Sequence, residues 1–255
     1  MHLRKDHAET NIHALQQFIK ANPLGVLTTS IASPTCSFPT LQATHIPFIL
    51  DVDNDTASNK LGRLRGHMAR DNPQAKALIE ALSQSTSNTL DQQVLIVFTS
   101  PIHHYITTNF YSETMSTNKR TAPTWNYSAA QVYGRAKVHW DSKKAETSAF
   151  LIQQLSDLAS LGEKDIMGFN GEDASPQPWK VEDAPASYVE RSLKGIIGLE
   201  IDIVTLEGKV KMSQELKEAD RDGVVEGLRK YGGETATRMA DLVHERGLMK
   251  ITNRA

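Results

Sequence analysis

Short segments in which small or apolar residues alternate with polar ones constrain the fold more than any other feature of the sequence. In the run QVYGRAKVHW, at residues 131–140, every second position is small or apolar, and the run at 197–203 repeats this pattern. A period of two is typical of a strand with one buried face. Five further strands are predicted at residues 24–31, 43–50, 60–69, 94–100 and 103–108. Because few helices separate them, the sequence predicts an α+β chain with an antiparallel sheet or barrel and not a doubly wound parallel sheet.

Helical periodicity is found near both ends of the chain and in its middle. Apolar residues recur at helical spacing from residue 12 to residue 19, and the spacing of Asp6 and Glu9 predicts a capping box before them. Further helices are predicted at residues 74–82, 143–161, 186–193, 218–231 and 234–246. Since no step in composition marks a boundary, we expect one domain over residues 1–255, with a C-terminal helical extension at about 216–250.

Two connections in the middle of the chain carry specific expectations. Residues 103–108 follow the segment 94–100 directly after Pro101, and we expect these two segments to pair as a hairpin. The stretch 109–122 is polar, and we expect it to form a loop.

Length and composition favour a globular protein that folds without disulfides. The single cysteine, Cys36, cannot form an internal disulfide, which indicates a reducing compartment. Lys and Arg number 28 and Asp and Glu 30, so the net charge of −2 disfavours a protein that holds nucleic acid by its overall field. No apolar run is long enough to cross a membrane, and the charged N-terminus lacks the apolar core of a secretory signal. We expect a cytoplasmic protein, or a nuclear one if it is a eukaryotic regulator.

Motifs for common cofactors and metals are absent or incomplete. The chain has no G-x-G-x-x-G dinucleotide fingerprint, no phosphate-binding P-loop and no G-x-S-x-G elbow. The DVDND motif at residues 51–55 resembles the start of a calcium loop, but Thr56 stands where that loop requires glycine. His103 and His104 are adjacent on a predicted strand and point to opposite faces. We therefore expect no metal site.

One predicted strand concentrates cations at alternate positions. Arg63, Arg65 and His67 share one face of it, and Arg70 and Asn72 follow where the strand ends. Guanidinium groups offer paired donors that suit a phosphate or another planar anion. The cluster is therefore either an anion-binding site or a charged face of the sheet, and the strand alone leaves both interpretations open.

A set of longer motifs, taken in order, indicates a family. They are THIPF at 44–48, RGHMARDNPQ at 65–74, VLIVFTSPIHHYIT at 94–107, PTWNY at 123–127, VYG at 132–134, LKGIIGLEIDI at 193–203 and KMSQ at 211–214. Together they resemble the PaiB family, the transcriptional regulators of PAI 2 type within the FMN-binding split-barrel superfamily, over about residues 1–250. The resemblance implies an antiparallel, six-stranded split β-barrel with peripheral helices. It also implies a homodimer that holds FMN in a groove between its subunits.

The resemblance carries over to particular residues. It places the phosphate grip at the end of the cationic strand and the start of the next helix, and it places Thr44 and His45 beside the isoalloxazine. Trp125 and Asn126 would reach the cofactor from the second subunit. The residues expected to bind FMN are Thr44, His45, Arg65, His67, Ala69, Arg70, Asn72, Gln74, Trp125, Asn126, Lys211, Ser213 and Gln214.

Some of these residues have a structural alternative. Trp125 could be a core aromatic, His45 could cap a strand, and Gln214 could satisfy backbone groups at a turn. The chain also departs from the family pattern, because Phe110 replaces a common tryptophan and Glu215 stands where an asparagine is frequent. These departures concern the substrate more than the fold.

Three functions remain in competition. The first is an FMN-dependent oxidoreductase or a flavin-linked regulator, in which the cofactor supplies the electron chemistry. The second is a transcriptional regulator without turnover, but the predicted helices at 218–231 and 234–246 mix acidic and basic residues, which disfavours direct DNA binding. The third is a haem-binding or haem-degrading protein. No acid–base pair is evident by spacing, and the sequence names neither a substrate nor an electron donor.

Overall fold

The computed structural model describes residues 1–32, 37–52, 60–83 and 85–252, so Cys36 and most of the DVDND segment lie outside the described residues. The chain divides into two compact units. Residues 16–98 and 132–206 form the barrel unit, and residues 1–15, 99–131 and 207–255 form the helical unit. Two long strands contribute residues to both units, and the expectation of one domain stays a prediction.

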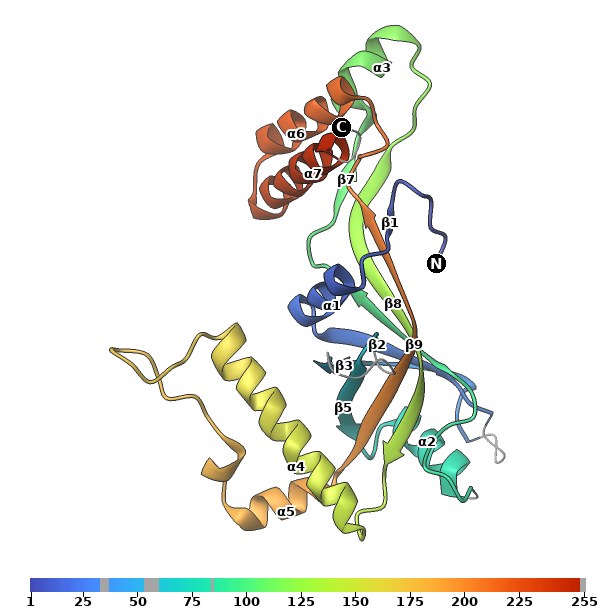
Figure 1. Ribbon diagram of the computed structural model, residues 1–255, viewed down its shortest axis with the longest axis vertical. Coiled ribbons are helices and arrows are strands. Elements are labelled where there is room, and N and C mark those ends of the chain that lie inside the picture. The colour runs from blue at the N-terminus through green and yellow to red at the C-terminus, as the bar shows by residue number, and fades with distance from the viewer. Residues whose placement is uncertain (33–36, 53–59, 84, 253–255) are drawn as a thin grey trace. The chain divides into compact units, whose positions relative to one another are not determined.

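Most strands of the sheet follow one hydrogen-bonded path (Figure 1). Their order is β3 (Leu41–Pro47), β2 (Leu24–Ser30), β6 (Val94–Thr99), β8 (Thr124–His139), β9 (Ile196–Lys211), β5 (Arg63–Ala69) and β4 (Ile49–Asp51). The pairs of β2 with β3 and β6, of β5 with β4 and of β5 with β9 are antiparallel. The expected antiparallel α+β class is confirmed.

The two ends of this path are neighbours in the sequence. Strands β3 and β4 stand at opposite ends of the order, yet only Phe48 separates them. One residue spans about 3.4 Å and adjacent strands lie about 4.8 Å apart, so the sheet must curl until its first and last strands meet. With β3 and β4 counted as one bent strand, the curled sheet has six strands. This is the expected split barrel.

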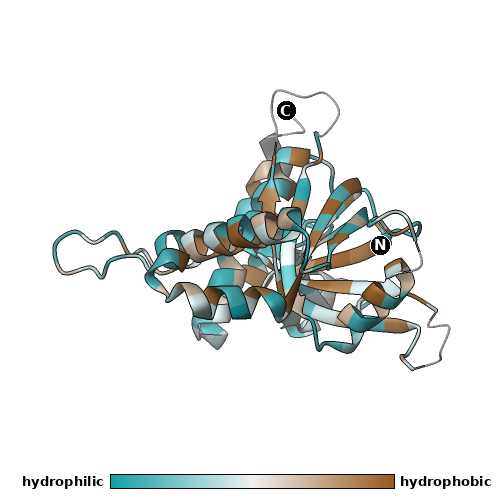
Figure 2. Cartoon of the chain, turned by 90° about the horizontal axis from the view of Figure 1, so that it is seen from below, coloured by the Kyte–Doolittle hydropathy of each residue, from teal (hydrophilic) through white to brown (hydrophobic). Residues whose placement is uncertain are grey.

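Alternation along the strands explains the barrel's core. On β5, Leu64 and Met68 are buried whereas Arg63 and Arg65 are half-buried. Hydrophobic residues, brown in Figure 2, recur along the strands in the same way. Gly134 allows a close approach of β8 to its neighbour, because a Cβ there would lie 2.6 Å from the carbonyl oxygen of Asp202. The largest buried side chains include Phe48, Leu64, Ile96, Phe98 and Leu199.

Helices pack around these strands. They are α1 (Ile12–Ala21), α2 (Pro73–Ser83), α4 (Ala145–Ser160) with a π-helical turn at Leu161–Ile166, and α5 (Ala186–Lys194). The expected capping box of Asp6 and Glu9 is not formed before α1. Asn11 caps the helix instead, since its Oδ1 accepts from Ala14 N at 3.1 Å while Glu9 accepts from Asn11 N.

The helical unit contains short strands and two C-terminal helices. Strand β7 (His104–Ile106) pairs with the start of β8, so the expected hairpin between residues 103–108 and 94–100 is wrong. The reason is that β8 begins at Thr124, earlier than predicted, and offers β7 a partner. Strand β1 (Ala8–Glu9) pairs with the end of β9.

A second hydrophobic cluster forms the core of the helical unit. Helices α6 (Glu218–Tyr231) and α7 (Glu234–Thr252) supply Val224, Leu228, Met239 and Val243 to it, and the segment after β7 adds Tyr111. That segment holds a 3₁₀ turn at Thr108–Phe110 and helix α3 (Ser112–Thr117), where we expected a loop. Within the described residues, no helix is long and apolar enough to span a membrane.

Candidate functional site

Three of the expected cofactor residues meet at the N-terminus of α2 in the barrel unit. Asn72 caps this helix, because its Oδ1 accepts a hydrogen bond from Gln74 N at 2.8 Å. Its Nδ2 donates to Thr44 Oγ1 at 3.1 Å, which ties the helix to β3. Since the Thr44 oxygen acts here as an acceptor, its own O–H remains able to donate to a ligand.

Gln74 fixes two strands beside this helix. Its buried Nε2 donates to Leu27 O at 3.2 Å, to Thr29 Oγ1 at 2.9 Å and to Gln42 O at 3.2 Å. Thr29, Gln42, Thr44, Asn72 and Gln74 are called the polar cradle below. Two of its atoms, Gln42 Nε2 and Gln74 Oε1, are buried and have no hydrogen-bond partner among the described residues. A buried donor without a partner is costly, so an acceptor from a ligand would stabilise this position.

The cations on β5 are engaged within the protein. Arg65 donates from Nε to Asp51 at 2.5 Å and from Nη2 to Asp157 on α4 at 2.8 Å. The hydrogen bond that Arg65 donates to Asp51 raises the pKa of Arg65 above its ordinary value, although burial opposes this. His67 Nδ1 lies 2.7 Å from Gln154 Oε1, and burial lowers the pKa of His67. Helix α4 thus covers this charged face, and a direct role of Arg65 and His67 in FMN binding stays a prediction.

Arg70 joins three backbone segments at the end of β5. Its Nε donates to Lys194 O at 3.0 Å, and its Nη2 donates to Trp140 O at 2.5 Å and to Ile196 O at 3.4 Å. Its Nη1 has no partner among the described residues and can still donate to an anion. His45 and Ala69 are both exposed, and His45 stands opposite Val26 in the β2–β3 pair.

An exposed aromatic surface marks the helical unit. Trp125, at the start of β8, is 53% exposed, so it is not a core aromatic. Its ring centroid lies 6.1 Å from that of Tyr105 on β7 and 5.8 Å from that of His103. His103, Tyr105 and Trp125 are called the aromatic platform below. Rings of this kind can stack on a planar ligand.

Three further expected residues are buried near this platform. Asn126 donates from Nδ2 to Ser213 Oγ at 2.9 Å, and Asn126 Oδ1 is buried without a partner among the described residues. Ser213 has a φ of +58°, in the left-handed region. Gln214 accepts from Met212 N and donates to Val210 O and Asp6 O. Gln214 therefore satisfies backbone groups, which was the structural alternative to a role in FMN binding.

Lys211 holds the start of β8. Its Nζ donates to Thr124 Oγ1 at 2.7 Å and to Trp125 O at 3.1 Å, and it lies 3.8 Å from Glu215 Oε1. His7 Nε2 lies 3.0 Å from the other oxygen of Glu215. Burial lowers the pKa of Lys211. Burial alone would raise the pKa of Glu215, but the contacts with His7 and Lys211 bring it below its ordinary value.

The structure therefore groups the expected residues into separate sets. Thr44, Asn72 and Gln74 share the polar cradle, and Arg65 and His67 lie beneath α4. The helical unit gathers Trp125, Asn126, Lys211, Ser213 and Gln214. Sequence reasoning missed Thr29, Gln42, His7 and Glu215, although Gln42 alternates with Thr44 on one strand and Glu215 is a departure from the family pattern.

The donors of the barrel unit fit the chemistry of FMN. A flavin mononucleotide presents phosphate, hydroxyl and carbonyl oxygens, all of which accept hydrogen bonds. Three donors could meet them: the Thr44 hydroxyl, and Gln42 Nε2 and Arg70 Nη1, neither of which has a partner among the described residues. The unsatisfied buried donor on Gln42 is the observation that most directly calls for such a ligand.

Comparison with known proteins agrees with this chemistry. The family model described as "Putative FMN-binding domain" matches residues 1–205. An uncharacterised protein of Aspergillus fumigatus is 51% identical over 261 residues, covering 98% of this chain and 99% of that protein. Protease synthase and sporulation protein PAI 2 of Bacillus subtilis is 26% identical over 247 residues, covering 96% and 98%.

Solved structures are more distant. The flavocytochrome Anf3 of Azotobacter vinelandii is 11% identical, with 82% of this chain and 72% of that chain covered and a TM-score of 0.46. The family model, by contrast, matches most of the sequence and includes the whole polar cradle. The chain therefore belongs to the FMN-binding family that its resemblance to PaiB indicated, with FMN as the cofactor.

Proposed function

We propose that the protein is an FMN-dependent oxidoreductase whose polar cradle grips the cofactor. The observation that carries this proposal is the buried Nε2 of Gln42, near Thr44, which has no partner in the part of the chain that the structure describes. Gln42, Thr44 and Arg70 Nη1 bind cofactor oxygens, Asn72 orients the Thr44 hydroxyl, and Gln74 fixes β2 and β3. FMN supplies the electron chemistry when it is bound, and the protein positions it.

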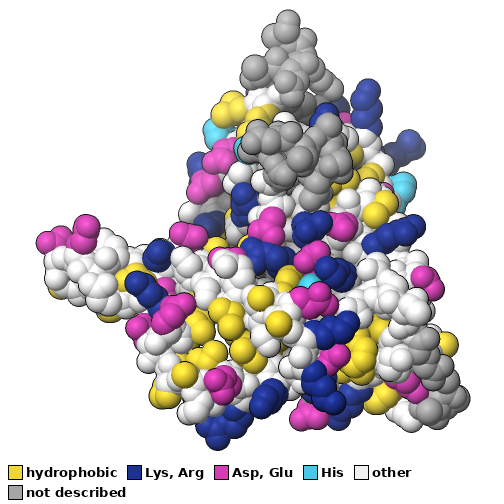
Figure 3. Space-filling view, turned by 60° about the horizontal axis from the view of Figure 1, so that its bottom comes forward, with side chains coloured by type: hydrophobic (Ala, Val, Ile, Leu, Met, Phe, Trp, Pro, Cys, Tyr) yellow, Lys and Arg dark blue, Asp and Glu magenta, His cyan; other side chains and the backbone are white. Residues whose placement is uncertain are grey.

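We further propose a homodimer in which the platform of one chain covers the cofactor held by the other. The support is the exposure of large apolar side chains, since Trp125 is 53% and Tyr105 45% exposed. Hydrophobic side chains, yellow in Figure 3, also reach the surface between charged ones. Burying them between two copies would remove apolar surface from water and exclude water from the flavin.

A flavin-linked regulatory role is the second candidate, and the resemblance to the PaiB family of transcriptional regulators suggests it. A direct reader of DNA needs free cations on one face. In the helical unit, however, Arg229 pairs with Asp241 at 3.0 Å and Arg246 with Glu9 at 2.6 Å. Arg221 is buried, with 8% of its surface exposed. The paired cations favour the enzyme, or an indirect effect on gene expression, over direct DNA binding.

The test is the spectrum and reduction of the purified protein. We expect flavin absorbance, release of FMN on heating, and bleaching of the flavin by NADH or NADPH without oxygen, followed by reoxidation with an acceptor. A protein that holds FMN but is reduced by no nicotinamide donor and turns over no acceptor would favour the regulator. A sharp Soret band in place of flavin bands would favour the haem protein.

A further inference from the structure

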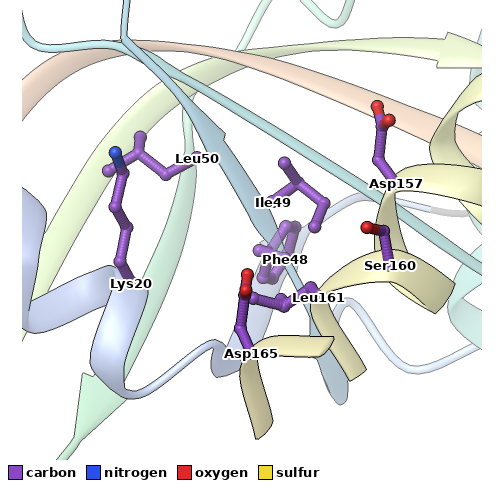
Figure 4. Close-up of a pocket in the computed structure, with 8 residues that line it drawn as sticks. All are labelled: Lys20, Phe48, Ile49, Leu50, Asp157, Ser160, Leu161 and Asp165. Carbon is purple, nitrogen blue, oxygen red and sulfur yellow. The ribbon is translucent and has the colours of Figure 1, made fainter. Parts of the chain in front are cut away.

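A hollow in the barrel unit shares no residue with the polar cradle. Its volume is about 470 Å³, within the range of roughly 300–1,000 Å³ that is typical of small-molecule sites. Residues from α1, from the bend between β3 and β4, from α4 and from the π-helical turn surround it (Figure 4). Its lining residues are Lys20, Phe48, Ile49, Leu50, Asp157, Ser160, Leu161 and Asp165.

The base of the hollow is apolar and is set by two interruptions of regular structure. Phe48 breaks the strand between β3 and β4, and its N–H donates to Pro23 O at 2.8 Å. Opposite, α4 ends in a π-helical turn, where Met167 N donates to Gly162 O five residues earlier. Turns of this kind are rare in proteins, and those that occur are often found at functional sites. The apolar base consists of Phe48, Ile49, Leu50 and Leu161.

The rim of the hollow carries one uncommitted charge of each sign. Lys20 comes from α1 and Asp165 from the π-helical turn, and Figure 4 shows both side chains to the left of Phe48 and Ile49, with Asp165 beside Phe48. Neither makes an ion pair or side-chain hydrogen bond with the described residues. Asp157, in contrast, is engaged by Arg65 at 2.8 Å and by Gln153 at 2.8 Å.

We propose that this hollow binds a small zwitterion with an apolar body, the chemistry of an apolar amino acid. The apolar group would lie on Phe48, Ile49 and Leu161, the carboxylate would meet Lys20, and the ammonium would meet Asp165. A ligand with a single charge complements only one of the two rim charges, and an uncharged one complements neither. Both rim charges are exposed to water, so each contributes modestly and selectivity needs both together.

The experiment measures binding of L-leucine and matched probes to the FMN-loaded protein by calorimetry and ligand-observed NMR. The probes are 4-methylpentanoate with the carboxylate alone, isoamylamine with the ammonium alone, N-acetylleucinamide with no charge, and glycine with no apolar body. Leucine should bind about five- to tenfold more tightly than each probe. Flavin absorbance in the same samples reports FMN occupancy, so failure of this site is distinguished from loss of the cofactor.

Four variants locate the site. Lys20→Gln should remove the preference for leucine over isoamylamine, and Asp165→Asn should remove the preference for leucine over 4-methylpentanoate. Ser160→Phe should fill the hollow and abolish leucine binding. The exposed-charge controls Lys143→Gln and Asp173→Asn should leave the affinity unchanged. Absence of leucine binding to the wild type, equal affinity for all probes, or affinity that survives Lys20→Gln, Asp165→Asn and Ser160→Phe would each overturn the proposal.

Discussion

Gln42 carries a buried amide donor that the described part of the fold leaves unused. Replacing it with leucine should weaken FMN binding roughly threefold to tenfold, because a hydrogen bond to the cofactor is lost. The free energy of unfolding of the apoprotein should stay the same or rise, since an unsatisfied donor leaves the interior. Flavin fluorescence titration and urea unfolding of the apoprotein measure these two quantities.

Gln131→Leu is the matched control for that substitution. Gln131 Oε1 is also buried without a partner among the described residues, but it belongs to the helical unit. This variant should keep the FMN affinity of the wild type. Unchanged affinity in Gln42→Leu would remove Gln42 from the site, and a loss of apoprotein stability there would show that its amide has a partner within the protein.

Arg70 has a structural task besides its proposed contact with the phosphate. Arg70→Ala should lower the free energy of unfolding of the apoprotein by about 1–3 kcal/mol, because three backbone carbonyls lose a cationic donor. Lys76→Ala, which removes only a surface pair with Asp71, should change it by less than about 0.5 kcal/mol. Urea unfolding of both apo variants is the measurement. If Arg70→Ala unfolds like wild type, these carbonyl contacts do not stabilise the protein.

The sequence located part of the candidate site because some contacts are local. Asn72 and Gln74 meet at one helix start, and Gln74 follows Asn72 by two residues, so a motif there predicts neighbours. The contact between His7 and Glu215 joins distant segments and leaves no periodic signal. The contact between Arg65 and Asp157 was equally hard to predict, since Asp157 lies on a helix 92 residues later in the chain.

Helix α4 covers β5 at His67, whose side chain lies 2.7 Å from Gln154 of that helix. Burial lowers the pKa of His67, and its hydrogen bond with Gln154 opposes this only in part. The unfolded chain binds a proton near pH 6.5, whereas the folded chain binds it at lower pH. The contribution of His67 to the free energy of unfolding should therefore be complete above about pH 6.5. It should be lost as the pH drops from there towards the folded pKa.

Urea unfolding at about pH 7.5 and about pH 5.5 tests this pH dependence. His67→Leu should reduce the difference in the free energy of unfolding between the two pH values, because one proton-binding group is removed. Burial also lowers the pKa of His139, so a residual dependence is expected. The prediction fails if His67→Leu and wild type lose the same stability between the two pH values.

Gly223 and Gly227 on α6 allow Phe110 and its turn to pack closely against the helix. A Cβ at Gly223 would lie 2.1 Å from the Phe110 carbonyl oxygen, which belongs to backbone and cannot simply move away. Gly223→Ala should therefore destabilise the protein by about 1–3 kcal/mol, although alanine favours helices. Gly162→Ala is the control, because nothing lies within 4 Å of its Cβ, and it should be neutral or stabilising. Thermal unfolding of both variants would contradict this packing if Gly223→Ala were as stable as the control.

The elements themselves were largely predictable, and their pairing was less so. Helix α6 spans the predicted residues 218–231 because its apolar spacing and the glycine after Tyr231 are local signals. The partner of β7 was not predictable, since β8 starts at Thr124 and pairing between distant segments is decided by what else is present. The same holds for α3, which is short and packs against α6 through Asp220, an acceptor for Glu113 N and Thr114 N.

Closure of the barrel follows from the order of the strands and from Phe48, the single residue between β3 and β4. Alternation predicted strands with one buried face, but only the positions of β3 and β4 at the two ends of the path show that the sheet curls. The resemblance to the PaiB family predicted the split barrel, and therefore a curled sheet. It also supplied the homodimer, which is a property of two chains and which no contact within one chain can test.

Mixed dimers can decide whether FMN is shared between chains. The test applies if the cradle of one chain and the platform of the other form each site. Chains with Gln42→Leu are then mixed with chains with Trp125→Ala. In a dimer of these two variants, one site receives both substitutions and the other receives neither. Random exchange makes about half of the dimers mixed, so about a quarter of all sites should regain wild-type FMN affinity. Flavin fluorescence titration after co-refolding, with light scattering to confirm a dimer of the 28.2 kDa chain, measures that fraction. A site built within one chain would restore none, because every chain would still carry one of the two substitutions.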